Sequence, residues 1–339
     1  MKRPWLRIAF LILMLLPAAF VITLVHLRAP DLVVYCAHDS LYADAVIRKF
    51  EAQSGLRVAV KYDSEATKSL GLTELLIYEH ERPQCDVFWN NELLGTRDLQ
   101  ARGMLAAYKG DGYARIPDKH KDADGLWTGF GARMRVYIVN TNRCNASYAA
   151  VDARLAADDL SRVAMARPLY GTTLTHYCVL WQQMGKAGVL GWHTSLRQRG
   201  LREVAGNSTV KNQVAAGACD LGFTDTDDFF LAKDAGAPVA LLPVVTPNNT
   251  TIVIPNTVAI IAGARQPANA RRFVDYLLSA ETEIALANSP SRQIPLGLVD
   301  PSLIPPEVAD LLPAAARGGT LSGLNEIRTA CIAWLKGEG

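Results

Sequence analysis

Residues 31–62 decide the fold class, and they read DLVVYCAHDSLYADAVIRKFEAQSGLRVAVKY. The short β-rich run at 31–35 predicts a strand, and the apolar spacing that begins at Leu41 and stops at Gly55 predicts a helix. Residues 56–62 then alternate apolar and polar side chains, which is the period of a strand. The order strand, helix, strand is the unit from which α/β proteins are built.

The alternation continues along the chain. The pattern predicts further strands at 86–89, 135–139, 163–166, 221–223, 251–254 and 258–261, and helices at 67–79, after the loop at 168–173, and after the turn at 206–208. Strands that alternate with helices favour a parallel sheet covered on both faces. Two such α/β lobes leave a cleft at the carboxyl ends of their strands, where open α/β sheets bind ligands.

The composition is that of a globular protein. Of 339 residues, 50% are hydrophobic and 20% are charged, which argues against disordered, collagenous and coiled-coil classes. The formal charge of +2 arises at the N-terminus, because four of the 35 basic residues and no acidic one precede residue 31, which leaves 31 basic against 33 acidic residues in the body. A slightly acidic body does not suit a polyphosphate backbone, so no nucleic-acid partner is expected.

The first 30 residues predict the cellular compartment of the protein. Lys2, Arg3 and Arg7 precede an uncharged stretch at 8–25, the pattern of a secretory signal peptide. The same stretch is long enough to span a bilayer and no clear cleavage site follows it, so an N-terminal membrane anchor is the alternative. Both alternatives place the body in the periplasm, either released by cleavage or tethered to the inner membrane by the N-terminal helix.

The cysteines leave their pairing open. An even number of them could form disulfides in an oxidising compartment, and buried free thiols are the simpler interpretation. There is no C-x-x-C motif and no zinc-type spacing. The six are Cys36, Cys85, Cys144, Cys178, Cys219 and Cys331.

Familiar enzyme signatures are absent from the sequence. There is no P-loop, no G-x-S-x-G, no H-E-x-x-H and no G-x-G-x-x-G. The histidines lack triad or metal spacing, and only His38 and His176 fall on loops expected at the cleft. We therefore expect a protein that is not an enzyme; an exported hydrolase or transferase on the same fold is a remote alternative that lacks a nucleophile and base.

Two kinds of polar feature are expected at the cleft. The turn after the strand at 221–223 holds Asp225, Asp227 and Asp228, whose mutual repulsion calls for a cation, an ammonium group, a helix N-terminus or solvent. A solvated turn that caps the following helix is the simpler alternative. The other feature is a pair of helix starts suited to an anion, formed by Gly171, Thr172 and Thr173 and by Asn207 and Ser208.

Several motifs together resemble one family. They are VYCAHD at 34–39, YDSEATK at 62–68, CDVFWNNE at 85–92, PLYGTT at 168–173, GNS at 206–208, GFTDTDD at 222–228 and IPNT at 254–257. In this order the chain resembles the periplasmic solute-binding proteins of ABC importers, in the iron(III)-type branch that also includes thiamine and aminoethylphosphonate binders. The resemblance implies two Rossmann-like lobes of periplasmic-binding-protein type II, joined by two crossover strands, with the ligand cleft between them.

The resemblance also implies site residues, with departures. Asp39 stands where the iron binders carry a histidine or tyrosine, and Asn91 with adjacent Glu92 where they carry a glutamate. Their adjacent tyrosine pair corresponds to Asp227 and Asp228, so the tyrosinates are missing. The positions that seat their synergistic anion correspond to the helix starts at 171–173 and Asn207. Further possible ligand residues are His38, Thr67, Asn91 and His176.

This organisation predicts an N-terminal segment and two lobes. Residues 1–30 form the signal peptide or anchor, residues 31–134 plus 262–339 the first lobe, and residues 135–261 the second lobe with the crossover strands.

The expected function is capture of a cation, iron or another metal with a synergistic anion, for import. Asp225, Asp227 and Asp228 are the candidate metal ligands, and Asp39 and Glu92 could add to them. The alternative is a zwitterionic amine or phosphonate, or a thiamine-like organic solute. No cofactor is expected beyond a metal ion as transported ligand. The expected partners are an ABC permease and its ATPase, and the expected state is a monomer.

Overall fold

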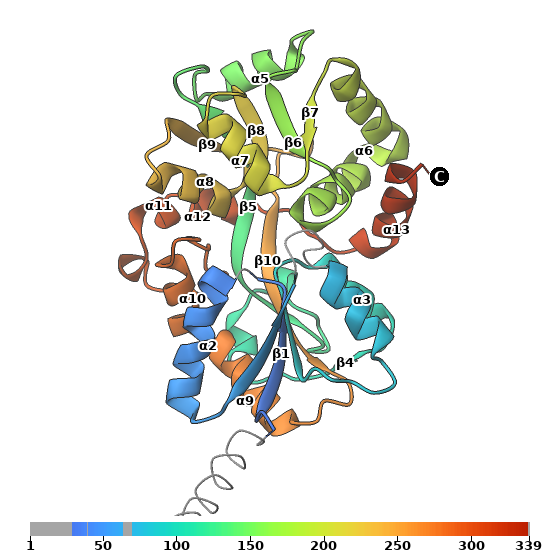
Figure 1. The fold of residues 1–339 in the computed structure, drawn as a ribbon, viewed down its shortest axis with the longest axis vertical. Helices are drawn as coiled ribbons and strands as arrows, with labels where there is room; N and C mark the ends of the chain where they lie inside the picture. Colours follow the sequence, from blue (N-terminus) through green and yellow to red (C-terminus); the bar gives the residue numbers. More distant parts are fainter. Residues whose placement is uncertain (1–28, 39, 64–69, 338–339) are drawn as a thin grey trace, which may run out of the picture.

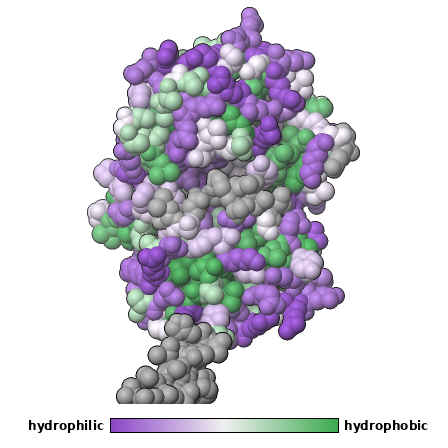
Figure 2. Space-filling view, in the orientation of Figure 1, coloured by the Kyte–Doolittle hydropathy of each residue, from purple (hydrophilic) through white to green (hydrophobic). Residues whose placement is uncertain are grey.

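The computed structural model describes residues 29–38, 40–63 and 70–337. Two lobes lie one above the other (Figure 1), and the space-filling view shows hydrophilic and hydrophobic residues interspersed over both (Figure 2). Nearly all of the predicted signal peptide or anchor, with Asp39 and Thr67, lies outside the described residues. Among the residues described, no helix is both long and apolar enough to cross a bilayer.

Strands and helices alternate as the sequence predicts. The strands are β1 (Leu32–Cys36), β2 (Val58–Tyr62), β3 (Val87–Asn90), β4 (Leu105–Ala106), β5 (Thr128–Asn140), β6 (Val163–Ala166), β7 (Arg202–Val204), β8 (Leu221–Asp225), β9 (Val239–Pro243) and β10 (Val253–Ile261). The α-helices are α2 (Ser40–Ser54), α3 (Leu70–Tyr78), α4 (Leu94–Ala101), α5 (Tyr148–Ala156), α6 (Gly171–Gln198), α7 (Asn207–Ala215), α8 (Thr226–Asp234), α9 (Pro267–Leu277), α10 (Ala280–Ala287), α11 (Pro306–Ala309), α12 (Leu312–Ala316) and α13 (Leu324–Leu335).

One mixed sheet runs through both lobes, in the order β2-β1-β3-β10-β5-β8-β6-β7. β1 pairs in parallel with β2 and β3 in the first lobe, and β6 pairs in parallel with β7 and β8 in the second. The strands between them, β10 and β5, are antiparallel to their neighbours. The purely parallel sheet predicted from the alternation is therefore wrong at its centre, because a strand that returns from the second lobe enters the first in the opposite direction.

β5 and β10 are the crossover strands, as expected. β5 pairs with β10 between Thr128 and Met134 and with β8 from Arg135 onward, so a single strand belongs to both lobes. The prediction placed this strand only at 135–139, because two glycines interrupt the apolar run before it. The pairing register of β10 shifts between Pro255 and Asn256, in the interval between the strands predicted at 251–254 and 258–261.

The C-terminal segment divides between the lobes. α9 supplies Phe273 and Leu277 to the core of the first lobe, where residues 262–339 were expected. Leu311 instead packs into the core of the second lobe, and α13 packs along α6 (Figure 1). The expected assignment of the whole segment to the first lobe therefore fails after α10. An amphipathic helix shows in its sequence that it buries one face, but not which lobe that face covers.

The buried carboxylate of Glu283 joins β5 to the C-terminal segment. It lies on α10, is 0% exposed and forms an ion pair of 2.5 Å with Arg115. Its oxygens also accept hydrogen bonds from the backbone N–H groups of Gly131 at 2.8 Å, Leu296 at 2.8 Å and Gly297 at 3.0 Å. A buried charge with this many donors is satisfied, and the loss of that charge leaves the donors without an adequate acceptor.

Replacement of Glu283 by glutamine is expected to lower the free energy of unfolding by about 3 kcal/mol, because the partly exposed guanidinium of Arg115 loses its counter-ion and the backbone N–H groups lose a charged acceptor. Urea unfolding followed by circular dichroism measures the change. Glu281→Gln is the matched control, because Glu281 lies on the same helix and pairs with Lys49 at the surface. That control is expected to cost less than about 1 kcal/mol. Equal losses in the two variants would contradict the role assigned to Glu283.

Candidate functional site: the cleft between the lobes

A cleft of about 740 Å³ lies between the two lobes. Ser40, Tyr42 and Asn91 line it from the first lobe, and Arg133 lines it from β5. The remaining lining residues come from the second lobe, and they are Ala166, Arg167, Tyr170, Gly171, Thr172, Thr173, Ala205, Gly206, Asn207, Ser208, Thr209, Asp225, Asp227, Asp228 and Leu231. The ligand cleft is thus where the sequence predicted it, and polar residues from both lobes face it.

Three helices begin at this cleft. α6, α7 and α8 start directly after β6, β7 and β8 or the short loops that follow them, and residues of each first turn line the cleft. Their N-cap residues, Tyr170, Gly206 and Asp225, make no side-chain capping hydrogen bond. Gly171 has φ +60°, a left-handed conformation that favours glycine. Helix starts attract anions, and the starts of α6 and α7, which the sequence predicts as an anion seat, both lie at this cleft.

Asp225 is held by a buried network. One carboxylate oxygen pairs with the guanidinium of Arg135 at 2.8 Å, and Arg135 is 0% exposed. The other oxygen accepts hydrogen bonds from the hydroxyl of Thr172 at 2.5 Å and the amide of Asn207 at 2.9 Å. The network therefore joins the starts of α6, α7 and α8 to β5. Asp225, Thr172 and Asn207 were all predicted as ligand residues, and here they form hydrogen bonds with one another. We therefore leave the carboxylate of Asp225 out of the proposed ligand set.

Asp227 has an arginine partner as well. Its carboxylate lies 3.2 Å from the guanidinium of Arg133, which is 5% exposed. Arg133 also donates to the backbone carbonyl of Asn91 in the first lobe. Arg133 thus links the start of α8 to the first lobe across the cleft. Much of the compensation that the acidic turn requires comes from two arginines of β5.

Asp228 is compensated in a different way. Its carboxylate accepts a hydrogen bond from the Thr224 hydroxyl at 3.0 Å. Burial and the charges of Asp227 and Asp225 raise the pKa of Asp228 from its ordinary value of 3.8 to about 8. It is therefore mostly protonated at neutral pH in the protein as described. The three carboxylates still offer oxygen atoms within 4.8 Å of one another, a spacing that could hold a metal ion.

The remaining predicted residues occupy different places. Ser208 and Asn91 line the cleft. Glu92 is buried outside this lining and caps α4, where its oxygens accept from the N–H groups of Leu94 at 2.5 Å and Gly95 at 2.7 Å. Glu92 was expected to be a ligand, but capping already uses both of its oxygens.

The two predicted histidines are buried outside the cleft lining. The ring of His38 lies 5.6 Å from those of Tyr42 and Trp89, and its Nε2 lies 2.8 Å from the side-chain nitrogen of Gln293. His176 packs near Phe223, and burial, with the charge of Arg135, holds its pKa well below the ordinary value. Neither histidine is placed to touch a ligand in the cleft.

Sequence reasoning missed several lining residues, notably Tyr42, Arg133, Arg167 and Tyr170. For Arg133 a signal was available. Arginines at positions 133 and 135 point to the same side of an otherwise apolar strand, and a buried arginine calls for a carboxylate. The acidic turn at 225–228 was the obvious source of such partners.

The fold and the cleft together define a two-lobe binding protein. The model of the family described as bacterial extracellular solute-binding protein matches residues 32–289. The chain belongs to this family, which confirms the resemblance to the solute-binding proteins of ABC importers. A relative from Haemophilus influenzae, an uncharacterized protein, is 26% identical over 279 residues, which are 78% of this chain and 77% of the relative.

Solved structures share the fold. Iron-bound HitA from Pseudomonas aeruginosa is similar with a TM-score of 0.76 and 22% identity, over 91% of this chain and 99% of that one. The ferric binding protein from Campylobacter jejuni gives 0.77 and 17%, over 91% and 99%. AfuA from Actinobacillus pleuropneumoniae, with exogenous fructose-6-phosphate bound, gives 0.74 and 20%, over 91% and 98%. These likenesses confirm the expected two-lobe α/β fold.

Asp228→Asn is expected to change how stability depends on pH. The folded-state pKa near 8 lies above the unfolded value near 3.8, so wild-type stability falls as pH rises between these values, whereas the amide does not titrate. Relative to wild type, the variant should therefore gain about 2 kcal/mol or more between pH 4 and pH 9. Urea unfolding at both pH values measures this, with exposed Asp158→Asn as the control. An unchanged difference in stability between Asp228→Asn and wild type at the two pH values would contradict the raised pKa of Asp228.

Proposed function

We propose that this protein captures a solute that carries an oxyanion, in the periplasm, and delivers it to an ABC permease and its ATPase. The protein works as a monomer, either cleaved after export or tethered by residues 1–30, and it catalyses no reaction. Closure of the lobes about β5 and β10 encloses the solute. Membership of a solute-binding family and the position of the cleft support this role.

The meeting of two uncapped helix starts, those of α6 and α7, at one cleft carries the proposal. Each of them offers backbone N–H donors and the positive end of a helix dipole. Arg167 adds an exposed guanidinium to the same lining. The nearby carboxylates do not cancel this field, because Asp225 and Asp227 are paired with arginines and Asp228 holds a proton. The balance of charge at the cleft favours an anion.

A phosphorylated organic solute fits this arrangement. Its phosphate would accept hydrogen bonds from the starts of α6 and α7 and pair with Arg167. Its hydroxyl or amino groups would then face Asp228 at the start of α8 and Tyr42 on the first lobe. The fructose-6-phosphate bound to AfuA supports a solute of this class, and an amine with a phosphonate group would use the same donors.

A metal ion with a synergistic anion is the second candidate. The spacing of the oxygen atoms of Asp225, Asp227 and Asp228 favours it, and so does the iron bound to the similar HitA. The ion would have to displace Arg133 from Asp227 and a proton from Asp228. The synergistic anion would bind at the same starts of α6 and α7 as the phosphate of an organic solute. The two candidate ligands therefore share this part of the site.

Calorimetry with fructose 6-phosphate, 2-aminoethylphosphonate, inorganic phosphate and ferric citrate tests the proposal. We expect a phosphorylated or phosphonate solute to bind, and Arg167→Gln to weaken that binding about 10-fold or more, because a charge-assisted contact is lost. Arg143→Gln is the matched control, since Arg143 is exposed on the second lobe and does not line the cleft. Its affinity should equal that of wild type.

The competing outcomes are distinct. Binding of ferric citrate alone, lost in Asp227→Asn and unaffected by Arg167→Gln, would replace the organic solute with the metal. Equal binding of phosphorylated solutes by wild type and Arg167→Gln would remove Arg167 from the site. A protein found only in the cytosol after cell fractionation would contradict the role in import.

A further inference from the structure

The C-terminal helix α13 contacts α4 of the first lobe and α6 of the second lobe. Toward the first lobe, Arg328 pairs with Asp98 of α4 at 3.2 Å, and the amide of Asn325 donates to a backbone carbonyl of the same helix at 3.1 Å. Toward the second lobe, the Trp334 ring lies 5.9 Å from that of Trp181 on α6 and 5.4 Å from that of His193. We call residues 324–335 the strap, because they contact both bodies that move when the cleft closes.

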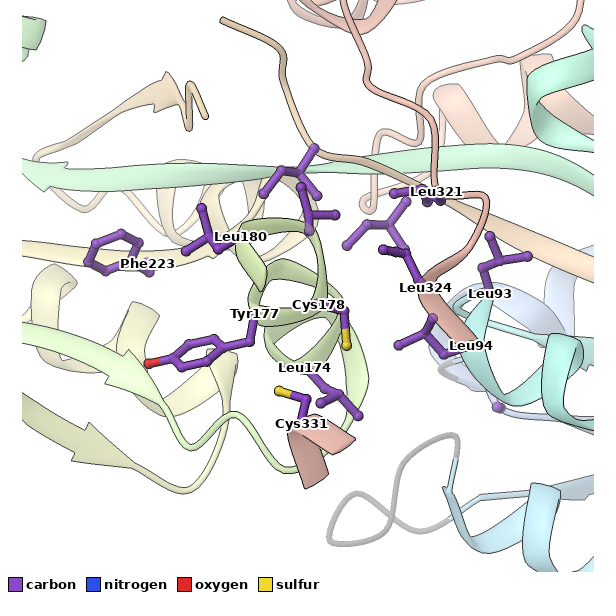
Figure 3. Close-up of a cluster of buried hydrophobic side chains, with 14 of the residues drawn as sticks. Leu93, Leu94, Leu174, Tyr177, Cys178, Leu180, Phe223, Leu321, Leu324 and Cys331 are labelled. Carbon is purple, nitrogen blue, oxygen red and sulfur yellow. The ribbon is translucent and has the colours of Figure 1, made fainter. Parts of the chain in front are cut away.

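Two cysteines meet where the strap crosses α6. Cys178 of α6 and Cys331 of α13 are both 0% exposed and both are free cysteines, and the Cys331 thiol is near enough to raise the pKa of Cys178. Figure 3 shows both sulfur atoms beside Leu174 where α6 meets α13. The cysteines lie on different elements, so a bond between them would close a loop of roughly 150 residues.

The other cysteines are engaged elsewhere. Each of the four has a sulfur atom within hydrogen-bond distance of an oxygen of its own neighbourhood: Cys36 with His38, Cys85 with Val87, Cys144 with Asn145 and Cys219 with Gln213. The pair of Cys178 and Cys331 therefore differs from them in having a second thiol as its neighbour.

We propose that Cys178 and Cys331 form a disulfide after export, and that this bond fastens the strap to the second lobe. The oxidising compartment rests on the proposed function, whereas the pairing rests on the geometry of α6 and α13. If the disulfide fixes the strap to the second lobe, the contacts between the strap and α4 must break when the lobes move apart. The disulfide thus makes those contacts a restraint on cleft opening.

The reaction is a thiol–disulfide exchange. One cysteine thiolate attacks the disulfide of an external oxidant, either oxidised glutathione or the active-site disulfide of an exported thiol oxidase, and one external thiolate leaves. The second cysteine thiolate then displaces the remaining external sulfur. Two protons and two electrons leave the pair, and the oxidant becomes two thiols. The neighbouring Cys331 thiol and burial raise the pKa of Cys178, so the exchange should precede complete docking of the strap.

Refolding of the reduced full-length protein in oxidised and reduced glutathione tests the pairing without reference to location or solute. Iodoacetamide in denaturant, followed by intact mass and peptide mapping, counts the free thiols. We expect four of the six cysteines to be alkylated and the two peptides that contain Cys178 and Cys331 to be linked. A reductant should then lower the melting temperature of wild type.

Matched variants decide the outcome. Cys178→Ser should leave all five remaining cysteines alkylated and a melting temperature that does not respond to reductant. Cys85→Ser, which removes another buried thiol, should keep the link. Six alkylated cysteines in wild type, or a link between any other pair, would overturn the inference. Neither result would affect the proposed function, which the binding and fractionation experiments test separately.

Discussion

The ion pair between Arg135 and Asp225 is the interaction on which the cleft depends. Its two residues face each other across the paired strands β5 and β8, in a region closed to water. Such a pair is costly to bury and is tolerated only when further hydrogen bonds complete it. Thr172 and Asn207 supply them, and in doing so they place the starts of α6 and α7 beside that of α8. The closeness of these helix starts is therefore a consequence of completing the hydrogen bonds of the Asp225 carboxylate.

β5 also supplies the positive charges that offset repulsion among the carboxylates of the turn at 225–228. Arg133 and Arg135 project from one face of β5 toward two of the three carboxylates, and the third takes up a proton. Internal compensation leaves the cleft open to a negatively charged solute, although its lining contains an acidic cluster. The number of charged residues in a site thus says little about the charge of its ligand until their partners are known.

Local patterns predicted what depends on local physics. The β-α-β unit at 31–62 and the helix starts at 171 and 207 follow from the periodicity of apolar residues and from the residues at the turns. Contacts between residues far apart in the sequence could not be predicted from these local patterns. Asp225 finds Arg135 across 90 residues of sequence, and Glu92 spends its oxygens on the N–H groups of α4. The sequence also could not show which lobe α13 packs against, because the apolar face of a helix can pack on any apolar surface.

The sharing of β5 between the lobes bears on how the chain folds and how it could have evolved. Its first half completes the sheet of one lobe and its second half completes the sheet of the other, without a break between Met134 and Arg135. No cut in the sequence separates the lobes without exposing unpaired strand edges in both. Although the molecule has two bodies, they share one strand, so an exchange of lobes between relatives would have to preserve this strand whole.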